Sequence, residues 1–206
     1  MVRYRPEYLL IGILSVFAIT GVVATSLDDG AGFGIMTPPR VEPVLPLGTI
    51  EPAPDARGWF EQVRPSCNSV DVQTRLDRQP PPPTPEGAMH AAACYALAGR
   101  IDRARVVIEG LPEGMRYQAA GVVFEVGHPA ADAGDEIAAG PLMELVVEYW
   151  PNHYMALYHA GAARFESRSY ARARSYLERF LDEYSAEDGW RASAISMLER
   201  IEGASR

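Results

Sequence analysis

From Gly58 onward the chain is a series of helix-length stretches separated by breaks of only a few residues. Apolar side chains in this part recur with the spacing of a helix, and the two-residue alternation of a strand is scarce. The breaks hold proline, glycine or serine, as at Pro112, Pro151 and Ser169. Helices joined by such short loops have to pack as antiparallel neighbours. The sequence therefore predicts an all-α fold with helices over Ala88–Ala98, Ile101–Glu109, Tyr117–Val126, Pro141–Tyr149, Tyr154–Glu166, Tyr170–Tyr184 and Trp190–Ile201.

Three units within this helical part repeat with a nearly constant period. They begin at Pro85, Ala120 and Tyr154, so their starts lie 35 and 34 residues apart. Small residues at the eighth and twentieth places let the two helices of a hairpin approach closely, and a large apolar residue at the twenty-fourth place fills the gap to the next hairpin. The eighth places hold Ala92, Gly127 and Gly161, the twentieth Ala104, Ala139 and Ala173, and the twenty-fourth Ile108, Met143 and Leu177.

With these positions, residues 85–187 resemble tetratricopeptide (TPR) repeats. The resemblance implies antiparallel helix hairpins that stack into an array, whose concave face binds extended or helical segments of other proteins. Residues 58–78 are then expected to form a degenerate first hairpin. Residues 188–203 are expected to form a C-terminal capping helix, with its apolar residues on the buried side. These residues are Trp190, Ala194, Ile195, Leu198 and Ile201.

The middle unit departs from the pattern at His128-Pro129. Proline lacks a backbone N–H and interrupts a helix interior, so the first helix of this unit is expected to end near Gly127. Residues 130–140 would then form an enlarged turn.

The N-terminal segment Leu9–Thr25 is apolar and carries no charge. Its 17 residues would rise about 26 Å as a helix, close to the thickness of a bilayer core. Arg3 and Arg5 precede the segment and acidic residues follow it, so the positive-inside bias places the N-terminus in the cytoplasm. We therefore expect residues 1–27 to be a single-pass anchor in the cytoplasmic (inner) membrane, inserted through residues 9–27. A cleaved signal peptide and a buried core helix are the alternatives.

Residues 28–57 are rich in proline and glycine. Such a composition cannot bury enough apolar surface to fold alone, so we expect a semi-extended tether. The helical domain is then residues 58–206, on the extracytoplasmic or periplasmic side of the membrane.

The charge balance excludes several classes of function. The 206 residues include 27 acidic and 19 basic ones, for a formal net charge of −8, and every basic residue is arginine. This balance argues against a protein that coats nucleic-acid phosphates. The absence of lysine excludes Schiff-base catalysis and the P-loop lysine, and the chain has no Gly-x-Ser-x-Gly motif. The sequence therefore predicts a protein that is not an enzyme, with no catalytic residues and no cofactor.

His128, Asp132, Asp135 and Glu136 lie together in the expected turn of the middle unit or directly before it. Carboxylates with an imidazole could hold a divalent metal ion, or act as a base and its orienting partner. Capping of the following helix explains the two aspartates equally well, because acids favour the positive end of a helix. We expect capping, and a metal-binding or hydrolytic site is the alternative. The other histidines, His90, His153 and His159, show no ligand spacing.

Cys67 and Cys94 are too few for a zinc ribbon. In an oxidising compartment they could form one disulfide that ties the segment before the proline-rich connector to the first repeat. Closing a loop of about 26 residues would stabilise the fold by about 3–4 kcal/mol. A pair of buried free thiols is the alternative.

Arginine and aromatic residues gather around the third unit. They could line a concave face that binds an acidic segment, although solvated helix faces and packing between helices explain many of them. The partner-binding candidates are Tyr154, Tyr158, Arg164, Arg168 and Arg172.

These features together predict a membrane-anchored, extracytoplasmic scaffold, assembly factor or docking factor for membrane-associated protein partners. An alternative is a permanent accessory subunit of a large membrane complex, such as an electron-transfer complex. A further alternative is a metal-binding or hydrolytic protein that uses His128, Asp132 and Asp135.

Overall fold

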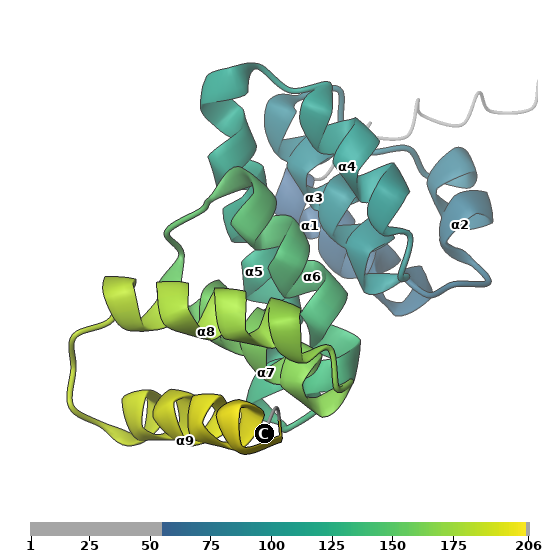
Figure 1. Cartoon of the computed structure of the whole chain (residues 1–206). Helices are drawn as coiled ribbons and strands as arrows, with labels where there is room; N and C mark the ends of the chain where they lie inside the picture. Colours follow the sequence, from purple (N-terminus) through teal and green to yellow (C-terminus); the bar gives the residue numbers. More distant parts are fainter. Residues whose placement is uncertain (1–54, 205–206) are drawn as a thin grey trace, which may run out of the picture. The chain divides into compact units, whose positions relative to one another are not determined.

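The computed structural model describes residues 55–204. All regular structure in that range is helical, which confirms the predicted all-α class. The predicted anchor (residues 1–27) and nearly all of the predicted tether (residues 28–57) lie outside the described residues. Among the described helices, none combines the length and the hydropathy needed to cross a bilayer. The elements are α1 (Ala56–Val63), the 3-10 helix η1 (Arg64–Ser66), α2 (Val72–Arg78), α3 (Pro85–Leu97), α4 (Ile101–Glu109), α5 (Glu113–Asp132), α6 (Glu136–Tyr149), α7 (Tyr154–Glu166), α8 (Tyr170–Glu183) and α9 (Gly189–Ala204) (Figure 1).

Capping side chains explain where four of these helices begin. At each start a side-chain atom accepts a hydrogen bond from the backbone N–H three residues later, which satisfies a donor that the helix itself leaves free. The acceptors are Asp55 at α1, Thr84 at α3, Asp135 at α6 and His153 at α7, over 2.7, 3.1, 3.1 and 3.2 Å.

The helices α3, α5 and α7 end in the same turn. Its left-handed residue is Gly99 after α3, Gly134 after α5 and Arg168 after α7, with φ of 70°, 86° and 58°. In each turn the next residue donates its N–H to the carbonyl five residues earlier, over 2.8, 3.0 and 2.8 Å, which satisfies a free carbonyl at the helix end. The three turns lie 35 and 34 residues apart, the spacing of the predicted units. The hairpins α3–α4, α5–α6 and α7–α8 therefore follow one repeated plan.

The small residues predicted at the eighth and twentieth places of each unit are all buried. A Cβ added to Gly161 would lie 2.8 Å from Leu177 Cγ on α8, and one added to Gly127 would lie 2.8 Å from Leu142 Cδ2 on α6. These distances are too short for a real Cβ, so a larger residue at either position would force the leucine side chain or the helix to move. The residues at the twenty-fourth places are fully buried: Ile108, Met143 and Leu177. The helix–helix packing is therefore compatible with the helical repeat that the sequence predicts.

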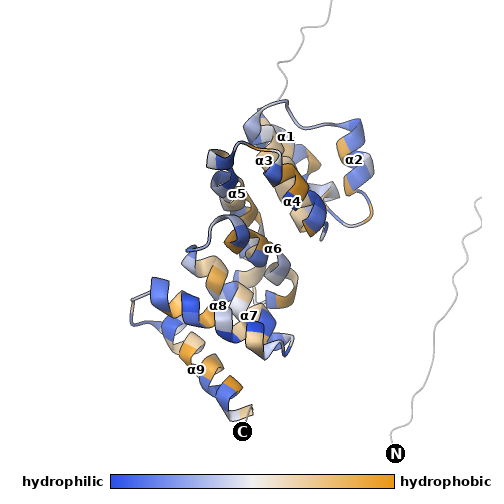
Figure 2. Ribbon diagram, turned by 45° about the horizontal axis from the view of Figure 1, so that its top comes forward, coloured by the Kyte–Doolittle hydropathy of each residue, from blue (hydrophilic) through white to orange (hydrophobic). Residues whose placement is uncertain are grey.

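The two helices of each hairpin pack on each other, and successive hairpins pack through their helices. The second helix of one hairpin contacts the first helix of the next, as α6 does with α7, and α3 also packs on α5. At the C-terminal end α9 covers parts of α7 and α8. At the N-terminal end α1 packs on α3 and buries Trp59, Phe60 and Val63. Figure 2 shows hydrophobic segments, in orange, on the neighbouring helices α3 and α4.

The expected end of the middle unit's first helix is wrong. α5 continues through Pro129 to Asp132, and the turn is Ala133–Asp135 rather than residues 130–140. Pro129 removes one backbone hydrogen bond near the end of the helix, where few further bonds depend on it. Gly127 packs on α6 and Ala131 is buried, so tertiary packing holds the last turn. α6 correspondingly begins at Glu136 and contains Pro141 in its first turns.

The predicted capping helix is present as α9, and Ala194 and Ile201 are buried as predicted. The prediction is wrong for Ile195, which is exposed. Trp190 keeps 37% of its surface exposed, but its ring packs on α7, with its centre 4.8 Å from that of Tyr158 and 5.6 Å from that of His159. Met197 is buried instead of Ile195, because the helix turns the face with Ala194, Met197 and Ile201 toward its neighbours.

Candidate functional site

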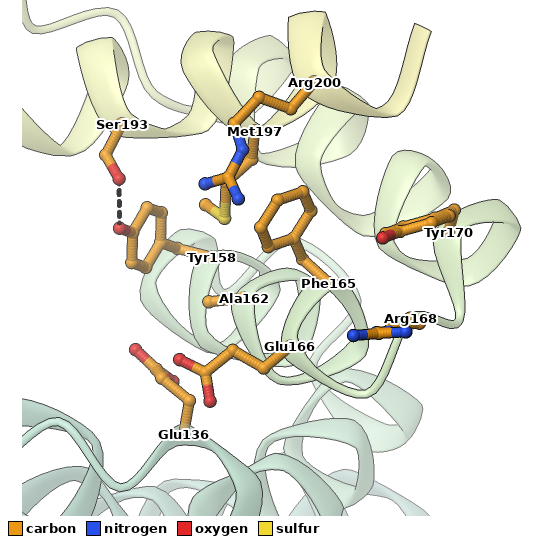
Figure 3. A pocket seen from close by; sticks show the side chains of 10 residues that line it. All are labelled: Glu136, Tyr158, Ala162, Phe165, Glu166, Arg168, Tyr170, Ser193, Met197 and Arg200. Atoms are coloured by element: carbon orange, nitrogen blue, oxygen red, sulfur yellow. Dashed lines mark hydrogen bonds between the residues drawn. The ribbon is translucent and has the colours of Figure 1, made fainter. Parts of the chain in front are cut away.

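A groove of about 620 Å³ lies between α7 and α9. Its floor comes from α7, one wall comes from α9, and the start of α6 and the turn between α7 and α8 close its sides (Figure 3). Its lining residues are Glu136, Tyr158, Ala162, Phe165, Glu166, Arg168, Tyr170, Ser193, Met197 and Arg200.

Two contacts hold the aromatic floor of the groove against α9. The Tyr158 hydroxyl donates a hydrogen bond to Ser193 Oγ at 2.9 Å. Burial raises the pKa of Tyr158, so its phenol stays protonated and available as a donor at neutral pH. The Arg200 guanidinium carbon lies 4.6 Å from the centre of the Phe165 ring, a cation–π contact. The floor therefore consists of aromatic rings in fixed positions.

The groove carries charges of both signs. Arg200 reaches in from α9, and the carboxylates of Glu136 and Glu166 lie on the side away from α9 (Figure 3). Arg168 is exposed at the end of α7, and among the described residues it forms no ion pair. Unpaired arginine beside aromatic rings is the composition that protein interfaces favour.

The structure places two of the five partner-binding candidates in this groove, Tyr158 and Arg168. The other three lie elsewhere. Tyr154 stacks on Tyr184, with ring centres 5.1 Å apart. Arg164 forms a bidentate ion pair with Glu144 of α6, which fixes the α6–α7 contact. Arg172 is exposed on α8 and does not line the groove.

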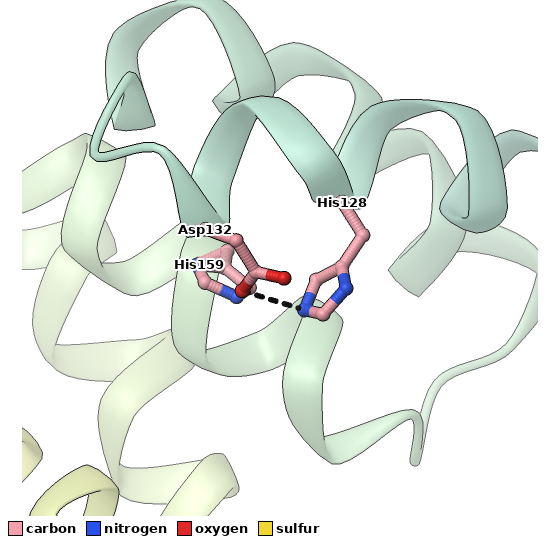
Figure 4. A group of neighbouring side chains, drawn as sticks. All are labelled: His128, Asp132 and His159. Carbon is pink, nitrogen blue, oxygen red and sulfur yellow. Dashed lines mark ion pairs between the residues drawn. The ribbon is translucent and has the colours of Figure 1, made fainter.

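A second cluster of polar side chains lies between α5 and α7 (Figure 4). His128 and Asp132, one helical turn apart on α5, meet His159 on α7. One potential ligand atom from each lies within 4.8 Å of the other two. The imidazoles of His128 and His159 have ring centres 5.1 Å apart. These three residues are the ones among the described residues that could hold a metal ion.

The two histidines differ in their partners. His159 is fully buried, and its Nδ1 lies 2.9 and 3.1 Å from the two carboxylate oxygens of Glu136. For His128, burial lowers the pKa, while the nearby Asp132 carboxylate acts in the opposite direction. The Nε2 atoms of both histidines are buried and have no hydrogen-bond partner.

The metal candidates predicted from the sequence fall into two groups. His128 and Asp132 belong to the cluster, on a helix instead of a turn. Asp135 does not belong to it, because its carboxylate caps α6 by accepting from Ala138 N at 3.1 Å. Sequence reasoning missed His159, which is 31 residues from His128. The repeat register was the available signal, since it puts both histidines on first helices of successive hairpins.

The structure joins Cys67 and Cys94 in a disulfide, with their Cα atoms 4.9 Å apart. Cys67 follows η1 and Cys94 is buried in α3, so the bond ties the N-terminal helices to the first repeat hairpin.

No protein-family model, curated protein or solved structure matches this chain.

Proposed function

We propose that residues 55–204 form a TPR-like repeat domain that binds a protein partner, as a scaffold or docking factor for membrane-associated proteins. The observation that carries this proposal is the groove between α7 and α9, with its aromatic floor and its unpaired Arg168. The repeated turns and the buried small residues support a TPR-like array, a class of fold that binds partner segments along its surface.

The lining of the groove favours a peptide segment as the occupant. The floor offers the rings of Phe165 and Tyr158 to an apolar side chain of a partner. Arg168 would pair with an acidic residue of the same segment, and Glu166 with a basic one. A partner that presents an apolar side chain between charges of both signs fits this arrangement.

The apolar run Leu9–Thr25 supports a membrane location for the protein, with the repeat domain outside the cytoplasm. An anchor of this kind confines the domain to a thin layer next to the membrane, which raises its effective concentration toward partners there. The groove could then work with modest intrinsic affinity.

The test is co-purification of the full chain from its native membrane in a mild detergent. We compare the wild type with Arg168→Glu, which reverses a charge in the groove, and with Arg78→Glu, which makes the same charge change on an exposed residue of α2. We expect a partner protein that the wild type and Arg78→Glu retain and that Arg168→Glu loses. Equal retention by the two variants, or no retained protein, would contradict the proposal.

The molar ratio of retained partner to this protein distinguishes a scaffold or docking factor from a permanent subunit. A scaffold or docking factor recovers its partner in variable amounts that depend on concentration. A permanent accessory subunit of a membrane complex recovers it in a fixed ratio.

A further inference from the structure

The cluster of His128, Asp132 and His159 contains two buried imidazole nitrogens that have no hydrogen-bond partner. An unsatisfied buried polar atom is costly, and nearly all such atoms in folded proteins are paired. The Nε2 of His128 lies 3.4 Å from Asp132 Oδ1, which is longer than an ordinary N–H···O hydrogen bond. The Nε2 of His159 has no partner at all among the described residues. A group held between these atoms would satisfy both nitrogens.

Glu136 fixes the tautomer of His159. Its two carboxylate oxygens lie 2.9 and 3.1 Å from His159 Nδ1. An ionised carboxylate only accepts hydrogen bonds, so Nδ1 carries the hydrogen and its N–H donates a hydrogen bond to Glu136. The lone pair of Nε2 is then directed away from Glu136 and is free to bind. A carboxylate behind the imidazole is the arrangement that orients histidine ligands at metal sites and strengthens their basicity.

We propose that His128, Asp132 and His159 bind a divalent transition-metal ion, with Glu136 positioning His159. Two imidazoles and one carboxylate are ligands that zinc accepts. The proposal is independent of the partner groove, although Glu136 lies beside both.

The geometry suits a four-coordinate ion after small side-chain movements. With ligand bonds of about 2.0–2.1 Å, two ligands of a tetrahedral zinc ion lie about 3.3 Å apart. His128 Nε2 and Asp132 Oδ1 are at 3.4 Å, and the widest separation in the set is within 4.8 Å. The Asp132 side chain is half exposed, so it can rotate toward the histidines and leave a path for the ion. Three protein ligands leave the fourth position for water, as at open zinc sites.

The bound ion would link two hairpins of the array. His128 and Asp132 are on α5 and His159 is on α7, and these helices belong to successive hairpins. Because the ion binds the folded chain and not the separated helices, it would raise the thermal midpoint of unfolding with increasing metal concentration.

The test is Zn²⁺ titration of the untagged full chain, first stripped with a chelator, by calorimetry and by thermal unfolding. We expect one Zn²⁺ per chain and a metal-dependent rise in the thermal midpoint. Asp132→Asn and His128→Gln are expected to weaken binding about tenfold or more. Glu136→Gln is expected to do the same, because the carboxylate that orients His159 is lost. Co²⁺ in the same site should give visible absorption bands that Glu136→Gln alters.

Two control variants show whether a loss of Zn²⁺ binding is specific to the cluster and is not caused by unfolding. His90 is a histidine of α3 that does not belong to the cluster. The His90→Gln variant should therefore bind Zn²⁺ like the wild type. Asp132→Asn replaces a half-exposed side chain, so its thermal midpoint in chelator should equal that of the wild type. A bridging water would satisfy the two nitrogens without any metal. Absence of Zn²⁺ uptake, or equal uptake by Asp132→Asn and the wild type, would therefore overturn the proposal.

Discussion

Arg168 holds a backbone conformation that the two equivalent turns give to glycine. Its φ is 58°, and the corresponding residues are Gly99 and Gly134. For a residue with a Cβ the left-handed region costs about 1–2 kcal/mol. Strain of this kind is often found where a side chain is needed for function. Arg168 lines the groove, so the proposed partner binding would explain arginine at a position where folding favours glycine.

Arg168→Gly is therefore expected to stabilise the protein while it weakens partner retention. The free energy of unfolding, measured by chemical denaturation, should rise by about 1 kcal/mol because the strain is relieved. Gly99→Ala is the matched control, since a Cβ there meets no atom within 4 Å and only the backbone conformation changes. It should lose about 1 kcal/mol. If the Arg168→Gly variant retained the partner as the wild type does, Arg168 would have no role in partner binding.

His153 caps α7 only while its ring is neutral. Its Nδ1 accepts a hydrogen bond from Ala156 N at 3.2 Å, which needs an unprotonated nitrogen. Burial lowers the pKa of His153 in the folded protein, and the nearby His128 lowers it further, whereas the unfolded chain keeps the ordinary value near 6.5. The stabilisation from this residue is thus complete above about pH 6.5 and is lost as the pH falls through the lower pKa of the folded state.

His153→Asn should retain the cap and lose this part of the pH dependence. Asparagine accepts the same hydrogen bond and does not titrate in this range. Denaturation with chelator present, from pH 7.5 to pH 5, should show a smaller decline in unfolding free energy for His153→Asn than for the wild type. His153→Ala should lose about 1 kcal/mol at pH 7.5, because the cap is gone. Parallel curves for the wild type and His153→Asn would contradict this role.

At the residue scale, the sequence predicts local roles of side chains better than it predicts contacts between residues that are distant in the chain. Asp135 caps α6, and capping depends on a few adjacent residues. The contact of His128 with His159 depends on how α5 and α7 are placed, which no local pattern encodes. For the same reason, the sequence does not distinguish Tyr158 and Arg168, which line the groove, from Tyr154, which packs on Tyr184.

Among the elements, α6 and α7 approach each other because glycine stands at their contact. A Cβ on Gly140 would lie 2.5 Å from the Cβ of Ala163 on α7. The Cβ of alanine is fixed to the backbone, so the two helices would have to separate to make room.

Gly140→Ala is expected to destabilise the protein by about 1–3 kcal/mol through this overpacking. Gly114→Ala makes the same change near the start of α5, where a Cβ meets nothing within 4 Å. It should stabilise the helix by about 0.5–1 kcal/mol, because alanine restricts the unfolded chain and favours the helix. Chemical denaturation measures both, and two effects of the same sign would argue against the close α6–α7 contact.

Helix positions follow from sequence more closely than helix ends do. The small residues Ala92, Gly127 and Gly161 predict where hairpin helices touch, because close packing leaves no choice of side chain. The end of α5 is different, since Pro129 disfavours a helix locally while burial of Ala131 favours it. Tertiary packing determines where such a helix ends, and a local sequence pattern does not reveal that packing.

On the scale of the whole molecule, the disulfide joins the N-terminal helices to the repeat array. α1 packs on α3, and the bond from Cys67 to Cys94 closes a loop of 27 residues. A loop of this length is expected to contribute about 3.5 kcal/mol in the chain-entropy account. The bond persists only in an oxidising compartment, so its state in the cell reports where the domain lies.

With the predicted anchor in place, we expect the cysteines to be disulfide-bonded in cells. Cells are quenched with acid, the protein is denatured, and free thiols are alkylated with a mass tag before and after reduction. The full chain should take up the tag only after reduction. A chain that lacks residues 1–27 should remain in the cytoplasm, take up two tags without reduction, and unfold at a lower temperature. The double variant Cys67→Ala/Cys94→Ala controls for tagging of other groups. Free thiols in the full chain would contradict the extracytoplasmic location, because buried cysteines 4.9 Å apart at Cα would oxidise there.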